Sequence, residues 1–282
     1  MKHLLHYILP VAALLTVACS NIDENERLIT IGELPEKEEG TTTDDMLETL
    51  TEPVPRYVLL EDFTGQECPN CPVATKIIGE IEATYNVVPV AIHSKPMGIN
   101  ENDNPQGLGT DLGDSYAKHW NLTSQPQGLI DRVGGMLFPH TNWLQLVGAS
   151  IGQKRTSLVD IRIDPLYVAE DDSADVAVYV ASVKDSAAVA GKLQLWITED
   201  SIIAPQDSMS TKLPNYVHNH VLRAAINGDW GEDVSVGGGD IRTIEHRIKL
   251  KSQWKPRHLA VVAFIYNDNG VVQATRKRLI EE

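Results

Sequence analysis

Two cysteines with two residues between them are the side chains of this sequence best placed for covalent chemistry. Cys68-Pro69-Asn70-Cys71 stands between an apolar run and a segment with helical periodicity. A thiolate at the start of a helix is stabilised by unpaired backbone N–H groups and by the positive end of the helix dipole. We therefore expect Cys68 to be the nucleophile and Cys71 to resolve a mixed disulfide, leaving the two cysteines joined to each other.

A zinc site is the competing interpretation of this pair. Such a site needs a second pair of Cys or His ligands, and the only other cysteine of the chain is Cys19. His218 and His220 are two residues apart, so on a strand they would face the same side. They have no recognisable further ligand, so we expect structural histidines and neither a metal nor a cofactor. We expect the nearby Arg223 to pair with an acid.

The segments around the cysteines alternate between strand and helix patterns. Continuous apolar runs predict strands, whereas apolar residues three and four apart predict helices. The predicted order is a strand at 57–63, a helix at 71–85, a strand at 87–93, an irregular insertion at 94–110, a helix at 111–120, strands at 128–133 and 136–138, and a helix at 142–157. Residues 54–158 are therefore expected to form an α/β domain, with the cysteines where its first strand meets its first helix.

The pattern changes beyond residue 158. Apolar and polar residues alternate there, which predicts strands with one buried face. The clearest runs are 174–180, 192–197, 244–250 and 259–266, and Asn267-Asp-Asn-Gly270 is typical of a hairpin turn. About seven strands at short spacing predict an all-β, antiparallel β-sandwich domain over residues 159–282.

The first residues have the pattern of an export signal. A short basic start precedes an apolar stretch, Leu4 to Ala18, that is too short to span a bilayer. Residues 15–19 resemble a lipobox, the signal after which a cysteine receives a lipid. We expect residues 1–18 to be a lipoprotein signal peptide and Cys19 to be the lipidated mature N-terminus. A plain secretory signal with an unmodified Cys19 is the alternative.

Residues 19–53 are expected to form an acidic, disordered tether. Eleven Asp and Glu residues stand there against Arg27 and Lys37, a composition that buries too little apolar surface to fold. The acids directly after Cys19 also resemble the export signal of some surface lipoproteins of Bacteroidetes, so the face of the membrane stays open. The whole chain has a formal net charge of −15, which repels phosphate backbones and argues against a nucleic-acid partner.

The order of elements around the CPNC motif resembles the thioredoxin superfamily. Asp62 precedes the first cysteine at the spacing of the family's buried acid, and the resemblance implies that it accepts the proton of the second cysteine. Pro126 falls at the family's cis-proline, which faces the active site. Gln125 would then face the cysteines and offer backbone hydrogen bonds to a substrate peptide. Glu67 replaces the family's usual aromatic residue, and a carboxylate there disfavours a thiolate.

A closer resemblance is to the twenty-eight-kilodalton outer-membrane protein (Omp) family of Bacteroidetes lipoproteins. It rests on four segments: Val58-Leu-Leu-Glu-Asp-Phe-Thr-Gly-Gln-Glu-Cys-Pro-Asn-Cys-Pro72, Pro126-Gln-Gly-Leu-Ile-Asp-Arg132, Tyr216-Val-His-Asn-His-Val-Leu-Arg223 and Val262-Ala-Phe-Ile-Tyr-Asn267. The resemblance implies an outer-membrane location and a thioredoxin-like domain followed by a β-domain. It implies no defined biochemical activity.

Four short motifs in the β-rich half resemble the acceptor motif for O-glycosylation of exported Bacteroidetes proteins. Each begins with Asp-Ser, and the acceptors would be Ser173, Ser186, Ser201 and Ser208. Three-residue motifs arise easily by chance, so only their clustering favours a modified serine. Measuring the mass of the mature protein would detect it.

The sequence leaves two functions open. The first is a thiol–disulfide oxidoreductase that forms mixed disulfides with envelope proteins or peptides through Cys68, supported by Cys71, Asp62 and Pro126. The second is a non-catalytic surface-binding or structural lipoprotein, in which a thioredoxin-like fold serves as a scaffold and the disulfide merely closes a loop. The sequence does not decide whether the protein is an enzyme.

Overall fold

The structure is a computed structural model that describes residues 50–209 and 211–281. They belong to one compact unit, Thr43–Glu282. The predicted signal peptide at 1–18, the lipidation site Cys19 and most of the tether at 19–53 lie outside the described residues.

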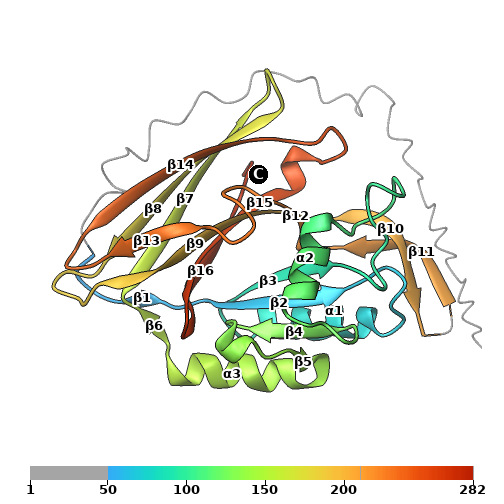
Figure 1. Cartoon of the computed structure of the whole chain (residues 1–282), viewed down its shortest axis with the longest axis horizontal. Helices are drawn as coiled ribbons and strands as arrows, with labels where there is room; N and C mark the ends of the chain where they lie inside the picture. Colours follow the sequence, from blue (N-terminus) through green and yellow to red (C-terminus); the bar gives the residue numbers. More distant parts are fainter. Residues whose placement is uncertain (1–49, 210, 282) are drawn as a thin grey trace, which may run out of the picture. The chain divides into compact units, whose positions relative to one another are not determined.

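The α-helices all lie in the first part of the described chain, and strands dominate the rest (Figure 1). The α-helices are α1 (Cys71–Glu82), α2 (Asp111–His119) and α3 (Trp143–Gln153). The strands among them are β1 (Val54–Pro55), β2 (Val58–Thr64), β3 (Val87–His93), β4 (Gln127–Ile130), β5 (Phe138–Pro139) and β6 (Thr156–Ser157). The later strands are β7 (Val159–Val168), β8 (Ser173–Ser182), β9 (Val189–Glu199), β10 (Ile202–Ser208), β11 (Thr211–His218), β12 (Val221–Ala225), β13 (Glu232–Val236), β14 (Ile241–Lys249), β15 (Leu259–Asn267) and β16 (Gly270–Arg278). Short 3-10 turns are η2 (Val133–Gly135), η3 (His140–Asn142) and η4 (Pro256–His258).

One mixed sheet joins strands from both parts of the chain. Its order is β16-β15-β9-β12-β3-β2-β4-β5, with β13 also paired to β9. β2 and β3 run parallel, as the helical crossover through α1 requires. The other edge of β3 would expose unpaired backbone groups, and β12 pairs with it through Val221 and Ala91. The sheet therefore continues across the predicted boundary between residues 158 and 159.

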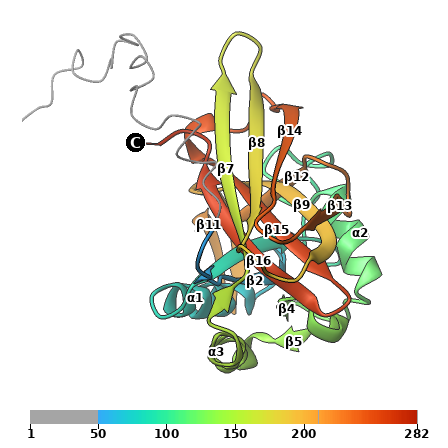
Figure 2. The same cartoon turned by 90° about the vertical axis from the view of Figure 1, so that its left-hand side faces the viewer.

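The helices cover both faces of the α/β part of this sheet, and Figure 2 shows α1 and α3 on one side and α2 on the other. Alternate side chains of β2 point to opposite faces of the sheet. Leu60 packs with α1, α3 and the fully buried Trp143, whereas Leu59 packs on the side of α2 and Tyr116. Full burial of an aliphatic side chain stabilises the fold by about 1.5–3 kcal/mol.

A second, three-stranded sheet lies over the β-rich end of the large sheet. It has the order β14-β8-β7 and is antiparallel throughout. Its apolar face packs on β9, β13 and β15, with side chains such as Val178, Leu195 and Val261 in the shared core. The predicted antiparallel layers are thus present, but one of them is part of the nine-stranded sheet that also contains β2 and β3.

Candidate functional site

The two cysteines lie where β2 ends and α1 begins. Cys71 is the first residue of α1, and Pro72 follows in the first turn, where its missing N–H costs no helical hydrogen bond. Cys68 and Cys71 form a disulfide with their Cα atoms 5.4 Å apart. Cys68 is 0% and Cys71 is 2% exposed. A second thiol cannot reach a bond so deeply buried unless the residues covering it move.

Asp62 lies beside the disulfide in the same cavity. This cavity has a volume of about 140 Å³, and both Asp62 and Cys71 line it. The carboxyl group is 2% exposed, and its Oδ1 has no hydrogen-bond partner within the described part of the chain. Burial disfavours the charged form and raises the pKa of Asp62 to about 8. The position is therefore suited to a group that takes up a proton near neutral pH.

Two histidines extend the polar lining of this cavity. His93 ends β3 and His218 ends β11, and their ring centroids are 5.3 Å apart. Burial, with smaller contributions from His218 and Arg223, lowers the pKa of His93 well below its ordinary value. Burial also lowers the pKa of His218 to about 4. Both rings are thus neutral at pH 7. The sequence analysis did not identify His93, because a histidine at the end of a strand gives no sign in the sequence that it lines a cavity.

The expectation that His218 and His220 share a strand face is wrong. β11 ends at His218, and His220 takes a left-handed φ of 58° in the following turn. Its ring nitrogens lie 3.4 Å from the Glu82 carboxylate and 3.6 Å from that of Asp200. Among residues 50–209 and 211–281, no three His, Cys, Asp or Glu side chains gather as metal ligands.

A hairpin from far along the chain covers the disulfide. It consists of β10 and β11, and we call it the covering hairpin. Gln206 on β10 is 2% exposed. Its Nε2 donates hydrogen bonds to the carbonyl oxygens of Gly65 at 3.1 Å and Cys68 at 3.0 Å. One amide side chain thus fixes the hairpin to the loop that carries the first cysteine.

Main-chain hydrogen bonds add to this attachment. The N–H of Asp207 donates to the carbonyl of Gln66 at 2.7 Å, and the N–H of Met209 donates to that of Pro69 at 3.0 Å. An extended peptide that docks beside a loop or strand binds through backbone groups of this kind. The covering hairpin therefore occupies backbone acceptors on both sides of Cys68 that a bound peptide would use.

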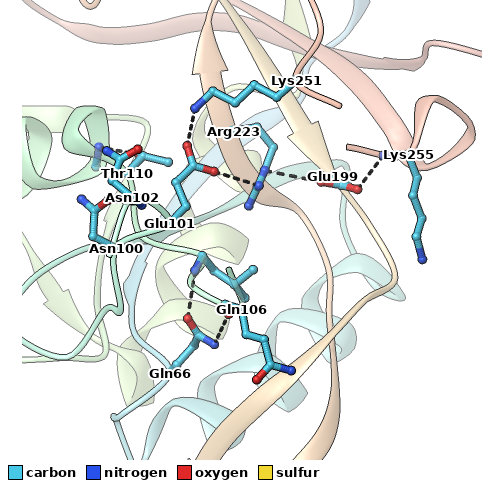
Figure 3. A network of polar contacts seen from close by, with 12 residues as sticks. Gln66, Asn100, Glu101, Asn102, Gln106, Thr110, Glu199, Arg223, Lys251 and Lys255 are labelled. Atoms are coloured by element: carbon cyan, nitrogen blue, oxygen red, sulfur yellow. Dashed lines mark hydrogen bonds and ion pairs between the residues drawn. The ribbon is translucent and has the colours of Figure 1, made fainter. Parts of the chain in front are cut away.

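The insertion at 94–110 also packs against the CPNC loop. The N–H of Glu67 donates to the carbonyl of Met97 at 2.9 Å. The side chain of Gln66 reaches the other end of the insertion and donates to the carbonyl of Gln106 at 2.9 Å, as Figure 3 shows. Two segments, the insertion and the covering hairpin, thus enclose the cysteines.

A buried ion-pair network ties the insertion to the β-rich half (Figure 3). Arg223 on β12 lies 3.0 Å from the carboxylate of Glu101 in the insertion and 3.4 Å from that of Glu199 on β9. Lys251 makes a further ion pair with Glu101. The prediction that Arg223 pairs with an acid is confirmed.

Replacing Arg223 with Lys is expected to lower the free energy of unfolding by about 1–2 kcal/mol. A single ammonium cannot bridge Glu101 and Glu199 as the guanidinium does, so one of these buried carboxylates loses its ion pair with residue 223. Urea denaturation measures the change. The matched control is Arg242→Lys, an exposed pair with Asp240, which should change stability by less than about 0.5 kcal/mol. Equal losses in the two variants would contradict the bridging role.

Gln125 and Pro126 lie between the loops of the site. The Gln125–Pro126 peptide bond is cis, the isomer that the resemblance implies. The Gln125 amide donates to the carbonyl of Thr64 at 2.6 Å and accepts from the N–H of Met97 at 3.1 Å. Neither residue lines the cavity beside the second cysteine. The Gln125 side chain thus holds the end of β2 to the insertion, and the predicted contact with a substrate peptide rests on its backbone.

The four serines of the Asp-Ser motifs differ in accessibility. Ser173 is 1% exposed, and its hydroxyl donates to Asp171. Ser186 and Ser208 are partly exposed, and Ser201 is exposed. Of the four, Ser201 is therefore the position that a modifying enzyme would reach most easily, and Ser173 the least accessible.

Comparison with protein families gives one match. A family model described as outer membrane protein Omp28 matches residues 113–282, which is more than half of the chain. The matched region includes most of α2 and all of the β-rich half, and the cysteine pair lies before it. No curated protein matches the chain. Within the described residues, no helix has the length and apolar character needed to cross a membrane.

Solved structures provide a second comparison. HBP35 of Porphyromonas gingivalis is 15% identical, with a TM-score of 0.63 over 80% of this chain and 76% of that one. A protein of Agrobacterium tumefaciens is 13% identical, with a TM-score of 0.49 over 80% of this chain and 95% of its own. A domain of the outer membrane lipoprotein Omp28 from Porphyromonas gingivalis is 19% identical, with a TM-score of 0.34 over 44% of this chain and 88% of that one. At these identities, the first of the three indicates a shared fold and nothing further.

Proposed function

Because the chain belongs to the outer membrane protein Omp28 family, we propose that it is a lipid-anchored envelope protein that exchanges thiols and disulfides through Cys68 and Cys71. The lipid would be attached to Cys19, and the partners would be envelope proteins or peptides. The α/β part would act as a thioredoxin-like domain. Two features support that fold: the alternation of strands and helices and the CPNC disulfide at the β2–α1 junction.

The observation that carries this proposal is the buried carboxyl of Asp62 beside Cys71, whose Oδ1 has no hydrogen-bond partner among the described residues. A disulfide that only closes a loop gains nothing from such a group, and burying a carboxyl without a partner costs stability. A carboxyl with a pKa of about 8 is matched to proton transfer near neutral pH. Its position in the cavity beside the disulfide therefore favours a reaction over a structural role.

The proposed reaction balances without a cofactor. The thiolate of Cys68 attacks a client disulfide, a mixed disulfide forms, and the client's other sulfur leaves as a thiolate. Asp62 then takes the proton of the Cys71 thiol. The Cys71 thiolate attacks the sulfur of Cys68, re-forming the Cys68–Cys71 bond and releasing the client's second thiolate. The same steps in reverse oxidise a client dithiol.

A scaffold role is the second candidate, and the burial of the disulfide favours it. Cys68 and Cys71 are 0% and 2% exposed, and the covering hairpin binds backbone groups on both sides of Cys68. In this case the disulfide would hold the CPNC loop in shape for the hairpin to pack on, and binding would take place elsewhere on the surface.

Replacing Cys71 with Ser distinguishes the two candidates. The variant cannot resolve a mixed disulfide, so in cells the full chain is expected to accumulate covalent adducts with envelope proteins. Denaturing gels run without reductant would show them, and reductant would remove them. The matched control is the double variant Cys68→Ser, Cys71→Ser, which should form none. The exchange proposal fails if the single variant is as free of adducts as the double one.

A further inference from the structure

The cavity beside Asp62 extends along the whole of α1. The residues of this helix that line it are Cys71, Thr75, Ile78, Gly79 and Glu82. They are three or four residues apart and therefore share one face of the helix. Cys71 is the first residue of α1 and Glu82 the last, so at about 1.5 Å per residue this face is about 16 Å long. The cavity leads from the disulfide to the far end of the helix.

The opposite wall consists of β3 and the turn that follows the covering hairpin. Pro89, Ala91 and His93 line the cavity at every second position of β3 and so point to one face of the sheet. Ala91 is the register partner of Asp62 on β2, which places both side chains on that face. His220, in the turn between β11 and β12, lines the far end beside Glu82.

The two ends of the cavity differ in exposure. Asp62 and Cys71 are each 2% exposed. Asp62 lines the cavity and its Oδ1 is enclosed, which leaves Oδ2 towards the cavity. At the other end, the side chains of Glu82 and His220 are 38% and 18% exposed. The cavity therefore connects a buried carboxyl group with the solvent.

The size and lining of the cavity suit water molecules. Its volume is about 140 Å³, whereas one water molecule needs about 10–15 Å³ and a small organic ligand needs roughly 300–1,000 Å³. Cavities that stay dry are apolar. This one has the side chains of Thr75, Tyr216 and His220 in its wall, all partly exposed. It is thus large and polar enough for several water molecules in a row.

His220 is held in place at the mouth of the cavity. Its N–H donates to Oδ1 of Asp200 at 2.8 Å, and its carbonyl accepts from the N–H of Ala91 at 2.8 Å. Its φ of 58° is left-handed, a conformation that costs energy in a residue other than glycine and is frequent at functional sites. Its Nε2 lies 3.4 Å from Oε1 of Glu82. An imidazole in this position can take up a proton at one nitrogen and release one from the other.

We propose that this cavity is the route by which the Asp62 carboxyl exchanges its proton with the solvent, with His220 and Glu82 passing the proton at its mouth. Asp62 releases its proton to a water molecule in the cavity, and neighbouring water molecules pass it on. His220 takes up a proton at one nitrogen and releases one from the other to Glu82 or to the solvent. Asp62 is then a carboxylate that accepts the proton of the Cys71 thiol. The use of this route in a reaction rests on the proposed thiol–disulfide exchange.

The state of Asp62 explains why such a route is needed. Burial raises its pKa to about 8, so at pH 7 the carboxyl holds a proton and must release it before it can accept another from Cys71. The charged groups facing His220 are Glu82 from α1 and Asp200 from the turn before β10, and Asp200 in turn pairs with Arg276 of β16. The two carboxylates favour the arrival of a proton at the mouth.

The first test follows the reaction of the reduced full chain with oxidised glutathione. Rapid mixing, acid quenching and mass measurement separate formation of the mixed disulfide at Cys68 from its resolution by Cys71. His220→Asn keeps a residue that tolerates a left-handed φ but cannot pass a proton. At pH 7 it should leave the first step unchanged and slow resolution at least about tenfold. Imidazole added to the buffer should restore the rate.

Two further variants complete this test. His246→Asn is the matched control, because His246 forms a similar pair with Glu232 and neither residue lines the cavity. It should change neither step. Glu82→Gln lies at the exposed end of α1 and should slow resolution in the same direction as His220→Asn, so the test stays valid if His220→Asn destabilises the fold.

The second test needs no disulfide exchange. Carbon NMR of the Asp62 carboxyl in the oxidised full chain detects how fast its two protonation states interconvert. Near its pKa of about 8, wild type is expected to give one averaged resonance that moves with pH. His220→Asn and Glu82→Gln should broaden or split it, because the proton leaves more slowly, whereas His246→Asn should not.

Two results would overturn the proposal. The first is an unchanged rate of resolution and an unchanged Asp62 resonance in both mouth variants. The second is slower resolution that imidazole does not restore, with the resonance unchanged, which is the result of a merely structural role of His220. If wild type forms no mixed disulfide while the mouth variants broaden the resonance, the exchange function fails and the proton route stands.

Discussion

Replacing Asp62 with Asn is expected to stabilise the oxidised protein at pH 7 by about 4 kcal/mol. The pKa of Asp62 is raised from 3.8 to about 8 by burial, so the folded state holds a proton that the unfolded state releases. The stability contributed by this proton is fully present below pH 3.8 and is lost as the pH rises towards 8. An Asn side chain has nearly the same shape and never ionises.

The pH dependence makes this prediction specific. Between pH 4 and 8, wild type should lose stability relative to Asp62→Asn by about 1.4 kcal/mol per pH unit, and the two should agree near pH 4. Urea denaturation without reductant, at several pH values, measures the difference. Asp164→Asn on the exposed side of β7 is the control and should change little. A pH-independent difference between wild type and Asp62→Asn would contradict the buried, protonated carboxyl.

Replacing Gln206 with Ala is expected to accelerate reduction of the disulfide by a small thiol by about 10- to 100-fold. The disulfide is buried, so a thiol reaches it only when the covering hairpin opens. The Gln206 side chain contributes two hydrogen bonds, to Gly65 and Cys68, each stabilising the closed state by about 1 kcal/mol. Losing both hydrogen bonds raises the population of the open state, and the rate of reduction rises by the same factor.

A second buried glutamine provides the matched control. Gln273 is 3% exposed, and its side chain holds Tyr57 and Pro55 by hydrogen bonds far from the hairpin in sequence. Gln273→Ala should lower global stability to a similar degree but leave the rate of reduction unchanged under native conditions. If both variants speed reduction equally, the thiol reaches the disulfide by global unfolding and not by opening of the hairpin.

Local patterns predicted the elements that hold the cysteines. The apolar run before Cys68 forms β2, and the helical periodicity after Cys71 forms α1. The strand and the helix depend on neighbours within a few residues along the chain, which is the range over which hydrophobic period and capping determine structure. Asp62 was identified through the resemblance to the thioredoxin superfamily, and it is buried beside the cysteines.

The position of the covering hairpin over the disulfide could not be predicted from local patterns. Gln206 is 138 residues from Cys68 in sequence and bonds to its backbone carbonyl, a group that every residue has. His93 and His218 are brought together because β12, directly after β11, pairs with β3. Pairing between strands so far apart leaves no periodic signal in either strand, and it is also the reason why the large sheet crosses the predicted domain boundary.

The reduction potential of the Cys68–Cys71 pair is the most direct test of the claim that it exchanges electrons with clients. The full chain would be equilibrated against glutathione buffers at pH 7 and the fraction of disulfide measured. Exchange predicts a potential between roughly −270 and −120 mV, the range of thiol–disulfide oxidoreductases. A value below about −300 mV, typical of structural disulfides, would contradict it and leave the disulfide as part of the scaffold.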